Sequence, residues 1–114
     1  MSIKGIGIDI IEVERIAKAC RENEKFLHRI FTQKEIDYCL NKKNKYQHLA
    51  ARFAAKEAFF KALGKRIRWR DIEIINQSTG KPEIKILNPS ISFQKIHVSL
   101  SHLDKYAVAI VVIE

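Results

Sequence analysis

Residues 51–64, ARFAAKEAFFKALG, decide the fold because they read as a helix that has no polar face. Apolar side chains point in every direction around its axis, which is typical of a helix buried on all sides. Two pairs of charges interrupt this pattern: Glu57 and Lys61 share one side of the helix, and Arg52 and Lys56 share another. Burying an unpaired charge costs roughly several kcal/mol. Each pair therefore requires a partner or a ligand.

The composition is that of a single globular domain covering residues 1–114. The net charge of +8 favours an acidic partner, whether nucleic acid, an anionic membrane, a phosphorylated ligand or an acidic protein. The hydrophobic share of 46% suffices for one core, and no apolar run reaches the roughly 18 residues of a membrane span. Cys20 and Cys39 form no C-x-x-C motif and no signal peptide is recognisable, so we expect a cytoplasmic protein without disulfides or a membrane segment.

The pattern along the chain predicts the α+β class, with an antiparallel sheet packed on a long central helix and on shorter helices. Thr32 and Glu35 predict a capping box at one helix start, and Gly64 predicts the end of the long helix. The last strand is apolar on both faces and should lie centrally or at a subunit interface. The expected strands are 3–11, 71–75, 82–87, 96–100 and 106–114, and the expected helices are 12–22, 25–30, 32–40 and 45–63.

Asp9 is the only charge in the apolar strand GIGIDII. It shares a face with Gly5 and Gly7, which leave room for another backbone or for a ligand. Two isolated carboxylates, Asp9 and Glu57, suit a divalent cation that holds phosphates, since Mg²⁺ takes one or two protein carboxylates. The alternative is a helix-stabilising ion pair between Glu57 and Lys61, worth about 0.2–0.5 kcal/mol. Spacing alone leaves both readings open.

Ser101 and His102 lie at the end of an expected strand, where functional residues concentrate, although a histidine at a turn is more often plain surface. The basic side chains are read first as solvated faces. Trp69 among arginines is compatible with base stacking, but interspersed acids and the lack of a nucleic-acid-binding motif argue against nucleic acid as the partner. The basic groups are Arg15, Arg21, Lys25 and Arg29; Lys42, Lys43 and Lys45; and Lys65, Arg66, Arg68 and Arg70.

Five motifs occur in order along the chain: GIGIDIIEVERI, FTQKEIDYC, ARFAAKEAFFKALG, TGKPEI and SLSHLDKYAVAIVVIE. Together they resemble the bacterial holo-[acyl-carrier-protein] synthases, the small 4′-phosphopantetheinyl transferases, over almost the whole chain. The resemblance implies a Mg²⁺-dependent enzyme that transfers 4′-phosphopantetheine from coenzyme A to a serine of an acidic apo acyl carrier protein for fatty acid biosynthesis. It also implies release of adenosine 3′,5′-bisphosphate and a homotrimer with active sites between subunits.

The same resemblance assigns roles to individual residues. Asp9 and Glu57 are implied as the magnesium ligands, and Glu57 and Lys61 as catalytic residues, with Lys61 at the pyrophosphate. The serine proton would go to Glu57 or to a metal-held water, and the sequence does not decide between them. The implied coenzyme A contacts are Lys61, Gly80, Lys81, Pro82, Ser101 and His102, and the implied carrier-protein docking residues are Arg15, Arg21 and Lys25.

One departure concerns residues 65–70, KRIRWR, which replace the small, glycine-rich stretch common in relatives, so that a flexible lid over the pantetheine arm is absent or is replaced by a basic one. Arg52 and Lys56 receive no role, and either a subunit interface or the nucleotide phosphates would suit them. Two other functions fit the residues alone. A basic nucleic-acid-binding module would not need Asp9, and a structural oligomer would use its buried charges only to fix an interface.

Overall fold

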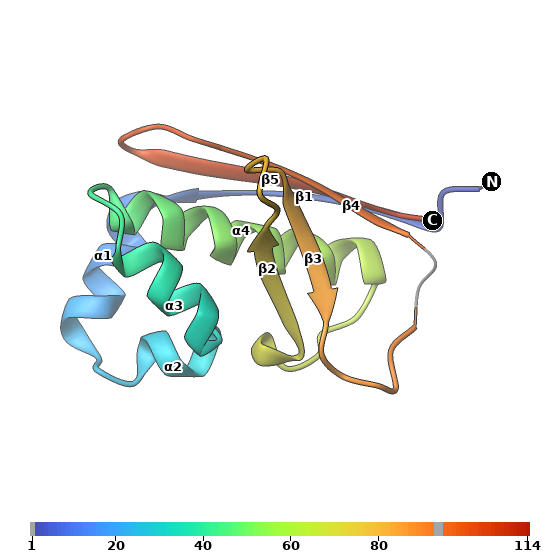
Figure 1. Cartoon of the computed structure of the whole chain (residues 1–114), viewed down its shortest axis with the longest axis horizontal. Coiled ribbons are helices and arrows are strands. Elements are labelled where there is room, and N and C mark those ends of the chain that lie inside the picture. Colours follow the sequence, from blue (N-terminus) through green and yellow to red (C-terminus); the bar gives the residue numbers. More distant parts are fainter. Residues whose placement is uncertain (1, 93–94) are drawn as a thin grey trace.

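The computed structural model describes residues 2–92 and 95–114 (Figure 1). Its order of strands and helices is the predicted one, and the boundaries agree to within a few residues. The elements are β1 Gly5–Glu12, α1 Val13–Glu22, α2 Phe26–Ile30, α3 Gln33–Leu40, α4 Lys45–Leu63, a 3-10 helix Trp69–Asp71, β2 Ile72–Asn76, β3 Pro82–Ile86, β4 Ile96–His102 and β5 Tyr106–Ile113.

The strands form two antiparallel sheets, and the expectation of one sheet is corrected in this respect. The first sheet has the order β1-β5-β4, and the second is the hairpin of β2 and β3. Strand β5 lies between β1 and β4, which confirms the central position predicted from its two apolar faces. In Figure 1 the three-stranded sheet covers α4 from above, while α1, α2 and α3 lie together below one end of it.

Helix α4 packs against β1 at backbone contact distance, because two positions of β1 lack a side chain. A Cβ atom at Gly5 would lie 1.9 Å from the carbonyl oxygen of Ala62, and one at Gly7 would lie 2.0 Å from that of Ala58. The open face predicted for this strand is therefore filled by the helix backbone. The helix ends at Gly64, whose φ of 82° confirms the predicted C-terminal glycine.

Lys56 on α4 joins β2 to α3 through buried contacts. Its side chain has no exposed surface, and Nζ contacts the carbonyl oxygen of Ile72 in β2 at 3.1 Å. Its ammonium also contacts Glu35 Oε1 at 2.8 Å and the carbonyl oxygens of Ile30 and Trp69 at 2.8 and 2.9 Å. These contacts hold β2 on one side of α4 while the three-stranded sheet covers another.

Glu35 completes this buried network and joins it to the predicted capping box. Its Oε1 accepts from the backbone N–H of Thr32 at 2.8 Å, and its Oε2 accepts from the N–H of Ile74 at 2.8 Å. Burial lowers the pKa of Lys56, and the negative charge of Glu35 opposes that shift. Lys56, unassigned by sequence, therefore has a structural role.

The outer face of the three-stranded sheet carries a stripe of exposed isoleucines. Ile6, Ile8 and Ile10 are 62%, 59% and 66% exposed, and their partners across the strands are Val112, Ile110 and Val108. A contiguous apolar surface of this kind is rare on a monomeric protein. This apolar face could be buried against another protein surface.

Candidate functional site

Asp9 on β1 and Lys61 on α4 meet at the edge of the helix–sheet contact. Lys61 Nζ lies 3.2 Å from Asp9 Oδ1 and donates to the carbonyl oxygen of Ile8 at 2.9 Å. Because Glu57 lies one helical turn before Lys61, the two carboxylates predicted as metal ligands come from neighbouring parts of β1 and α4. Among residues 2–92 and 95–114, the alternative ion pair between Glu57 and Lys61 is not formed.

Glu57 is held instead by Arg66. A single terminal nitrogen of Arg66 contacts Glu57 Oε1 at 2.9 Å and Oε2 at 3.2 Å. The side chains of Asp9 and Glu57 are each only 18% exposed, whereas those of Lys61 and Arg66 are 55% and 63% exposed. The structure thus presents two recessed carboxylates, each paired with a more exposed cationic side chain. Sequence reasoning placed Arg66 in a solvated loop, and no spacing rule connects it to Glu57.

The donor set of this cluster fits magnesium. In the part of the chain that the structure describes, no group of three or more His, Cys, Asp or Glu side chains is arranged to hold a metal ion. Two carboxylates alone do not enclose a cation. Mg²⁺, however, binds through one or two carboxylates and completes its shell with water and substrate phosphates. Asp9 and Glu57 fit a magnesium ion that is shared with a phosphate-bearing substrate.

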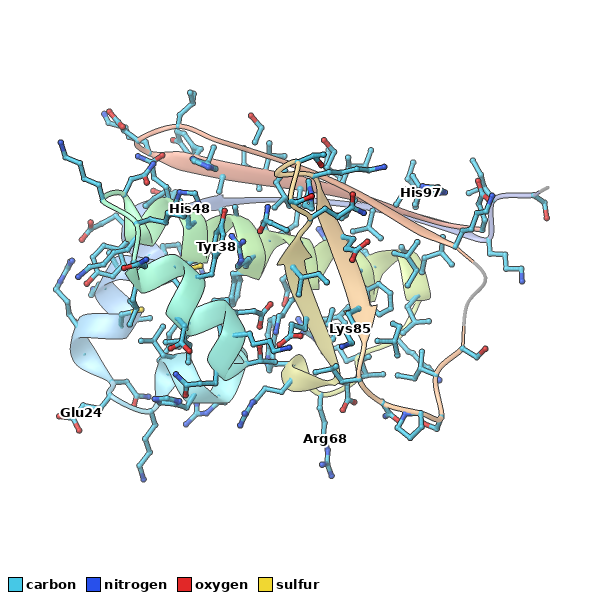
Figure 2. All side chains as sticks on the ribbon, viewed as in Figure 1. Glu24, Tyr38, His48, Arg68, Lys85 and His97 are labelled. Carbon is cyan, nitrogen blue, oxygen red and sulfur yellow. The ribbon has the colours of Figure 1, made fainter. Side chains whose placement is uncertain are left out.

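A second group of predicted residues lines a cavity on another side of α4. Gly80, Pro82 and His102, three of the implied coenzyme A contacts, come together there with Arg52, which sequence reasoning left unassigned. The cavity has a volume of about 250 Å³ and is lined by Tyr38, His48, Ala51, Arg52, Asn76, Gly80, Pro82, Leu100 and His102. The labelled Tyr38 and His48 lie between α3 and α4 in Figure 2, with ring centroids 5.9 Å apart.

Arg52 is the charged side chain of this cavity. It is 2% exposed, donates to Asn76 Oδ1 at 2.5 Å and lies 4.3 Å from the centroid of the Tyr38 ring. Its Nε is buried without a hydrogen-bond partner, and no acidic side chain of the described residues pairs with it. A buried guanidinium with an unused donor favours an anionic ligand.

Histidines add further polar groups to the cavity. His102 Nδ1 lies 2.8 Å from Gln47 Oε1, and the rings of His102 and His48 are 5.0 Å apart. Burial lowers the pKa of His48, and the neighbouring His102 and Arg52 lower it further. The cavity therefore favours neutral His48, and a bound anion would oppose that preference.

Ser101 and Lys81 do not line this cavity. Alternation along β4 exposes Ser101 on the outer face of the sheet, where it lines a separate hollow with Ile10 and Tyr106. Lys81 is exposed in the turn before β3. The structure thus brings together Gly80, Pro82 and His102 but leaves Ser101 and Lys81 beside them.

The acidic cluster, formed by Asp9, Glu57, Lys61 and Arg66, and the cavity lined by Arg52 occupy opposite sides of α4 within one chain. Lys61 reaches β1, whereas Arg52 reaches Asn76 at the end of β2. Helical geometry places Arg52 and Lys61, nine residues apart, roughly 180° from each other around the axis. The residues implied as coenzyme A contacts therefore do not form one pocket in a single chain.

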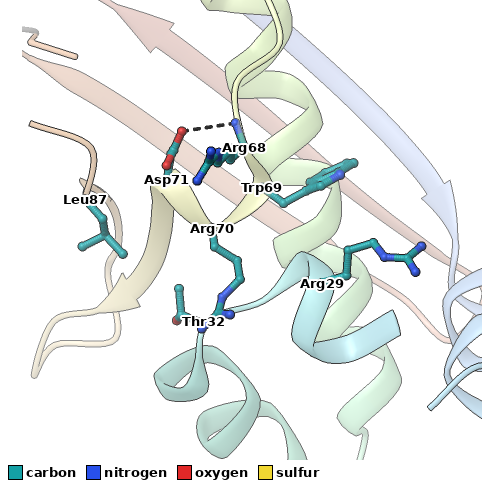
Figure 3. Close-up of a pocket in the computed structure, with 7 residues that line it drawn as sticks. All are labelled: Arg29, Thr32, Arg68, Trp69, Arg70, Asp71 and Leu87. Carbon is teal, nitrogen blue, oxygen red and sulfur yellow. Dashed lines mark hydrogen bonds between the residues drawn. The ribbon is translucent and has the colours of Figure 1, made fainter. Parts of the chain in front are cut away.

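A third region is a cavity of about 630 Å³ between α2 and the 3-10 helix (Figure 3). Three exposed arginines surround it, and none of them forms an ion pair with any residue of ranges 2–92 and 95–114. Sequence reasoning missed it because its basic side chains lie about 40 residues apart. Its lining residues are Arg29, Thr32, Arg68, Trp69, Arg70, Asp71 and Leu87.

Trp69 lines the arginine-lined cavity and packs on aromatic side chains of α4. Its ring stacks on Phe53 with centroids 5.0 Å apart and an interplanar angle of 25°, and it meets Phe60 edge-on at 5.2 Å. Both phenylalanines lie on α4 within one turn of Glu57. One face of the indole is therefore occupied by Phe53 within the protein.

The predicted docking residues lie on the exposed surface of α1 and just before α2. Arg15, Arg21 and Lys25 are all exposed. Arg21 pairs with Glu14 at 2.5 Å, and this contact raises the pKa of the Arg21 guanidinium. Arg15 and Lys25 form no ion pair with the described residues.

The comparisons with known proteins agree with the motifs over the full chain. Residues 5–111 match the model of the 4′-phosphopantetheinyl transferase superfamily. The holo-[acyl-carrier-protein] synthase of Thermodesulfovibrio yellowstonii is 49% identical over 114 residues, covering 97% of this chain and 98% of that protein. The corresponding protein of Chloroherpeton thalassium is 47% identical, with 96% of each chain covered.

Solved structures give the same result. A holo-(acyl-carrier-protein) synthase from Bacillus anthracis, in complex with CoA (3′,5′-ADP), has a TM-score of 0.87 and 40% identity, covering 98% of this chain and 96% of its own. A holo-[acyl-carrier-protein] synthase from Helicobacter pylori, in complex with coenzyme A, has a TM-score of 0.85 and 34% identity, covering 96% and 99%. This chain therefore belongs to the holo-[acyl-carrier-protein] synthase family of the 4′-phosphopantetheinyl transferase superfamily.

Proposed function

We propose that the protein transfers 4′-phosphopantetheine from coenzyme A to a serine of apo acyl carrier protein and releases adenosine 3′,5′-bisphosphate, serving fatty acid biosynthesis. The observation that carries this proposal is the pair of recessed carboxylates, Asp9 and Glu57, each neutralised by one cation. Membership of the family and the coenzyme A complexes of two relatives support it.

In this proposal Asp9 and Glu57 hold a magnesium ion. The ion would supply positive charge to the two phosphates of coenzyme A and so offset the charge that develops during transfer. The chain's own contribution is a pair of carboxylates, one on β1 and one on α4, whose side chains are each 18% exposed. Lys61, already drawn to Asp9, provides a cation at the same place.

The reaction is an in-line displacement at the β-phosphorus of coenzyme A. The serine oxygen forms the new P–O bond, and the bond from phosphorus to the oxygen of the 5′-phosphate breaks, releasing adenosine 3′,5′-bisphosphate. We assign Lys61 to the departing phosphate, whose growing negative charge its ammonium stabilises. The serine proton would go to Glu57 or to a water that the metal would hold.

The cavity with Arg52 suits the nucleotide end of coenzyme A. Arg52 lines the cavity and has no acidic partner among the described residues, so its positive charge would attract a phosphate of the adenosine bisphosphate. His102, Gly80 and Pro82 line the same cavity, whereas Lys81 and Ser101 do not line it within one chain. Arg52 thereby joins the contacts that sequence reasoning assigned to coenzyme A.

A homotrimer with sites between subunits would bring the acidic cluster of one subunit next to the Arg52 cavity of another. The acidic cluster and the cavity lie on opposite sides of α4, so one molecule of coenzyme A reaches both only if they come from different subunits. The exposed stripe of Ile6, Ile8 and Ile10 supplies an apolar face to bury. Light scattering should give three times the chain mass. Ile8→Asp should lower that mass, whereas Leu40→Asp on α3, also exposed, should not.

Carrier docking is proposed on the basic face formed by Arg15, Arg21 and Lys25. The net charge of +8 favours approach of an acidic protein, and such attraction weakens as salt rises. The arginine-lined cavity lies next to α2 and extends this positive surface toward the 3-10 helix.

A cytoplasmic location and a single domain over residues 1–114 remain part of the proposal. Both cysteines are free, and burial raises the pKa of the Cys39 thiol to about 11, so this thiol stays protonated and unreactive. Of the helices in the described ranges, none has the length and apolar character needed to cross a membrane.

The function is tested by incubating the protein with coenzyme A, Mg²⁺ and an apo acyl carrier protein and then weighing the carrier by mass spectrometry. The expected result is a gain of one phosphopantetheine, blocked by a chelator and restored by added Mg²⁺. No mass gain on any of several acidic carriers would contradict the proposal.

A further inference from the structure

Arg66 and Glu57 form a contact that the proposed reaction leaves unexplained. Glu57 is needed as a metal ligand, yet here both of its carboxylate oxygens face one nitrogen of Arg66 at 2.9 and 3.2 Å. We propose that Arg66 is an exchangeable counter-ion: it holds Glu57 in the free protein and moves to the pyrophosphate when metal and coenzyme A bind. This inference rests on the proposed function and concerns the same site.

The position of Arg66 allows such a movement. Its side chain is 63% exposed and belongs to the basic segment 65–70, directly after the end of α4. Its guanidinium lies 5.4 Å from the ring centroids of both Phe60 and Trp69, so two aromatic faces support it beside Glu57. Rotation of this exposed side chain would exchange the Glu57 carboxylate for a phosphate without moving a helix or a strand.

The charges around the site explain why the exchange would occur. In the free protein, Asp9 and Glu57 balance Lys61 and Arg66, so the cluster is neutral. A divalent cation alone would leave two uncompensated positive charges in this recessed site, which is unfavourable. The pyrophosphate of coenzyme A brings two negative charges and restores neutrality. Arg66 should therefore oppose binding of the metal alone and favour binding of metal and coenzyme A together.

This coupling separates the proposal from an ordinary surface ion pair. Removing a pair that only stabilises the fold would change the stability of the protein and leave both ligand affinities unchanged. A counter-ion that moves between ligands would change the two affinities in opposite directions when its charge is removed. The sign of the two effects is thus the decisive observation.

The test compares wild type, Arg66→Gln and the matched control Lys65→Gln. Lys65 lies beside Arg66 in the same exposed segment and has no contact with Glu57, so its replacement removes the same charge without the same partner. Binding of Mn²⁺, used as a probe for Mg²⁺, is measured by electron paramagnetic resonance without coenzyme A. Binding of coenzyme A is measured by calorimetry at a fixed excess of Mg²⁺.

Arg66→Gln should bind Mn²⁺ alone about fivefold more tightly and coenzyme A about fivefold more weakly, a size that one partly exposed ion pair can produce. Lys65→Gln should stay within about twofold of wild type in both measurements. Arg66→Lys, which keeps the charge, should recover most of the coenzyme A affinity. Unchanged affinities in Arg66→Gln, or shifts in the same direction, would overturn the proposal. A wild type that binds neither ligand would instead contradict the proposed function.

Discussion

Lys61 on α4 pairs with Asp9 on β1, with 3.2 Å between Nζ and Oδ1, and not with Glu57 one turn earlier on its own helix. The contact crosses 52 residues of sequence. It leaves Glu57 to Arg66, and together the four side chains form a neutral cluster at the edge of the α4–β1 contact. We propose this cluster as the place where phosphoryl transfer occurs.

Removing either carboxylate should abolish transfer without unfolding the protein. We expect Asp9→Asn and Glu57→Gln each to lower the rate of carrier modification by about 100-fold or more, because each removes a ligand of the proposed metal ion. Thermal melts should stay close to wild type, since the ion pairs lost are partly exposed. Full activity of either variant at ordinary Mg²⁺ would rule out its assignment as a metal ligand.

Lys56 should matter for stability far more than the lysine one turn and a half further along α4. Lys56→Met leaves Glu35 buried without its cation and should lower the free energy of unfolding by about 3–5 kcal/mol. Lys61→Met, the same chemical change at a side chain that is 55% exposed, should cost about 1 kcal/mol or less. Urea denaturation followed by circular dichroism measures both, and equal costs would contradict the structural role of Lys56.

His48 should make stability fall in mild acid. Its pKa is lowered in the folded protein, first by burial and then by the charges of His102 and Arg52. The unfolded chain therefore binds a proton at a higher pH than the folded one. The stability associated with neutral His48 is complete above its ordinary value of about 6.5 and decreases as the pH falls through that value toward the folded pKa.

The measurement is urea denaturation at pH 7.5 and pH 5.5. His48→Gln should lose less stability between these two values than wild type, because its side chain cannot take up the proton. His28→Gln, which replaces an exposed histidine on α2, should keep the wild-type loss. If His48→Gln loses as much stability as wild type between these two pH values, another group is responsible for the pH dependence.

Arg15 should affect the carrier and not the nucleotide. Arg15→Glu reverses an exposed, unpaired charge on α1 and should weaken binding of an acidic apo carrier several-fold, mainly by slowing association, with coenzyme A affinity unchanged. Lys85→Glu, the same reversal on β3 (Figure 2), should leave carrier binding near wild type. Surface plasmon resonance at low and high salt measures how each variant binds the carrier and coenzyme A. Equal losses of affinity for both ligands in Arg15→Glu would argue against a docking role.

Local features of the fold were predictable from sequence, because neighbouring residues determine them. The capping box of Thr32 and Glu35 formed as predicted, and so did the end of α4 at Gly64. The central place of β5 followed from its two apolar faces. Each depends on hydrogen bonds or burial patterns within a short segment.

Contacts between distant segments were not predictable in the same way. Glu35 was recognised as a capping residue, but its contact with Lys56 depends on how α3 and α4 pack. The same lysine contacts β2, in the second of the two sheets, and the spacing of residues along the chain does not predict that contact. The alternative in which Glu57 pairs with Lys61 was wrong, because Glu57 pairs with Arg66 of the exposed segment 65–70. The spacing of residues along the sequence gives no information on contacts between distant segments.

The central claim is that one site combines the acidic cluster of one subunit with the Arg52 cavity of another. Mixing subunits that carry Asp9→Asn with subunits that carry Arg52→Ala, followed by weighing the carrier, tests it most directly. Each variant alone should be inactive. Equal mixing after denaturation and refolding should restore about a quarter of the wild-type rate, because one interface in four then pairs two intact halves. A mixture as inactive as its two components would contradict the claim.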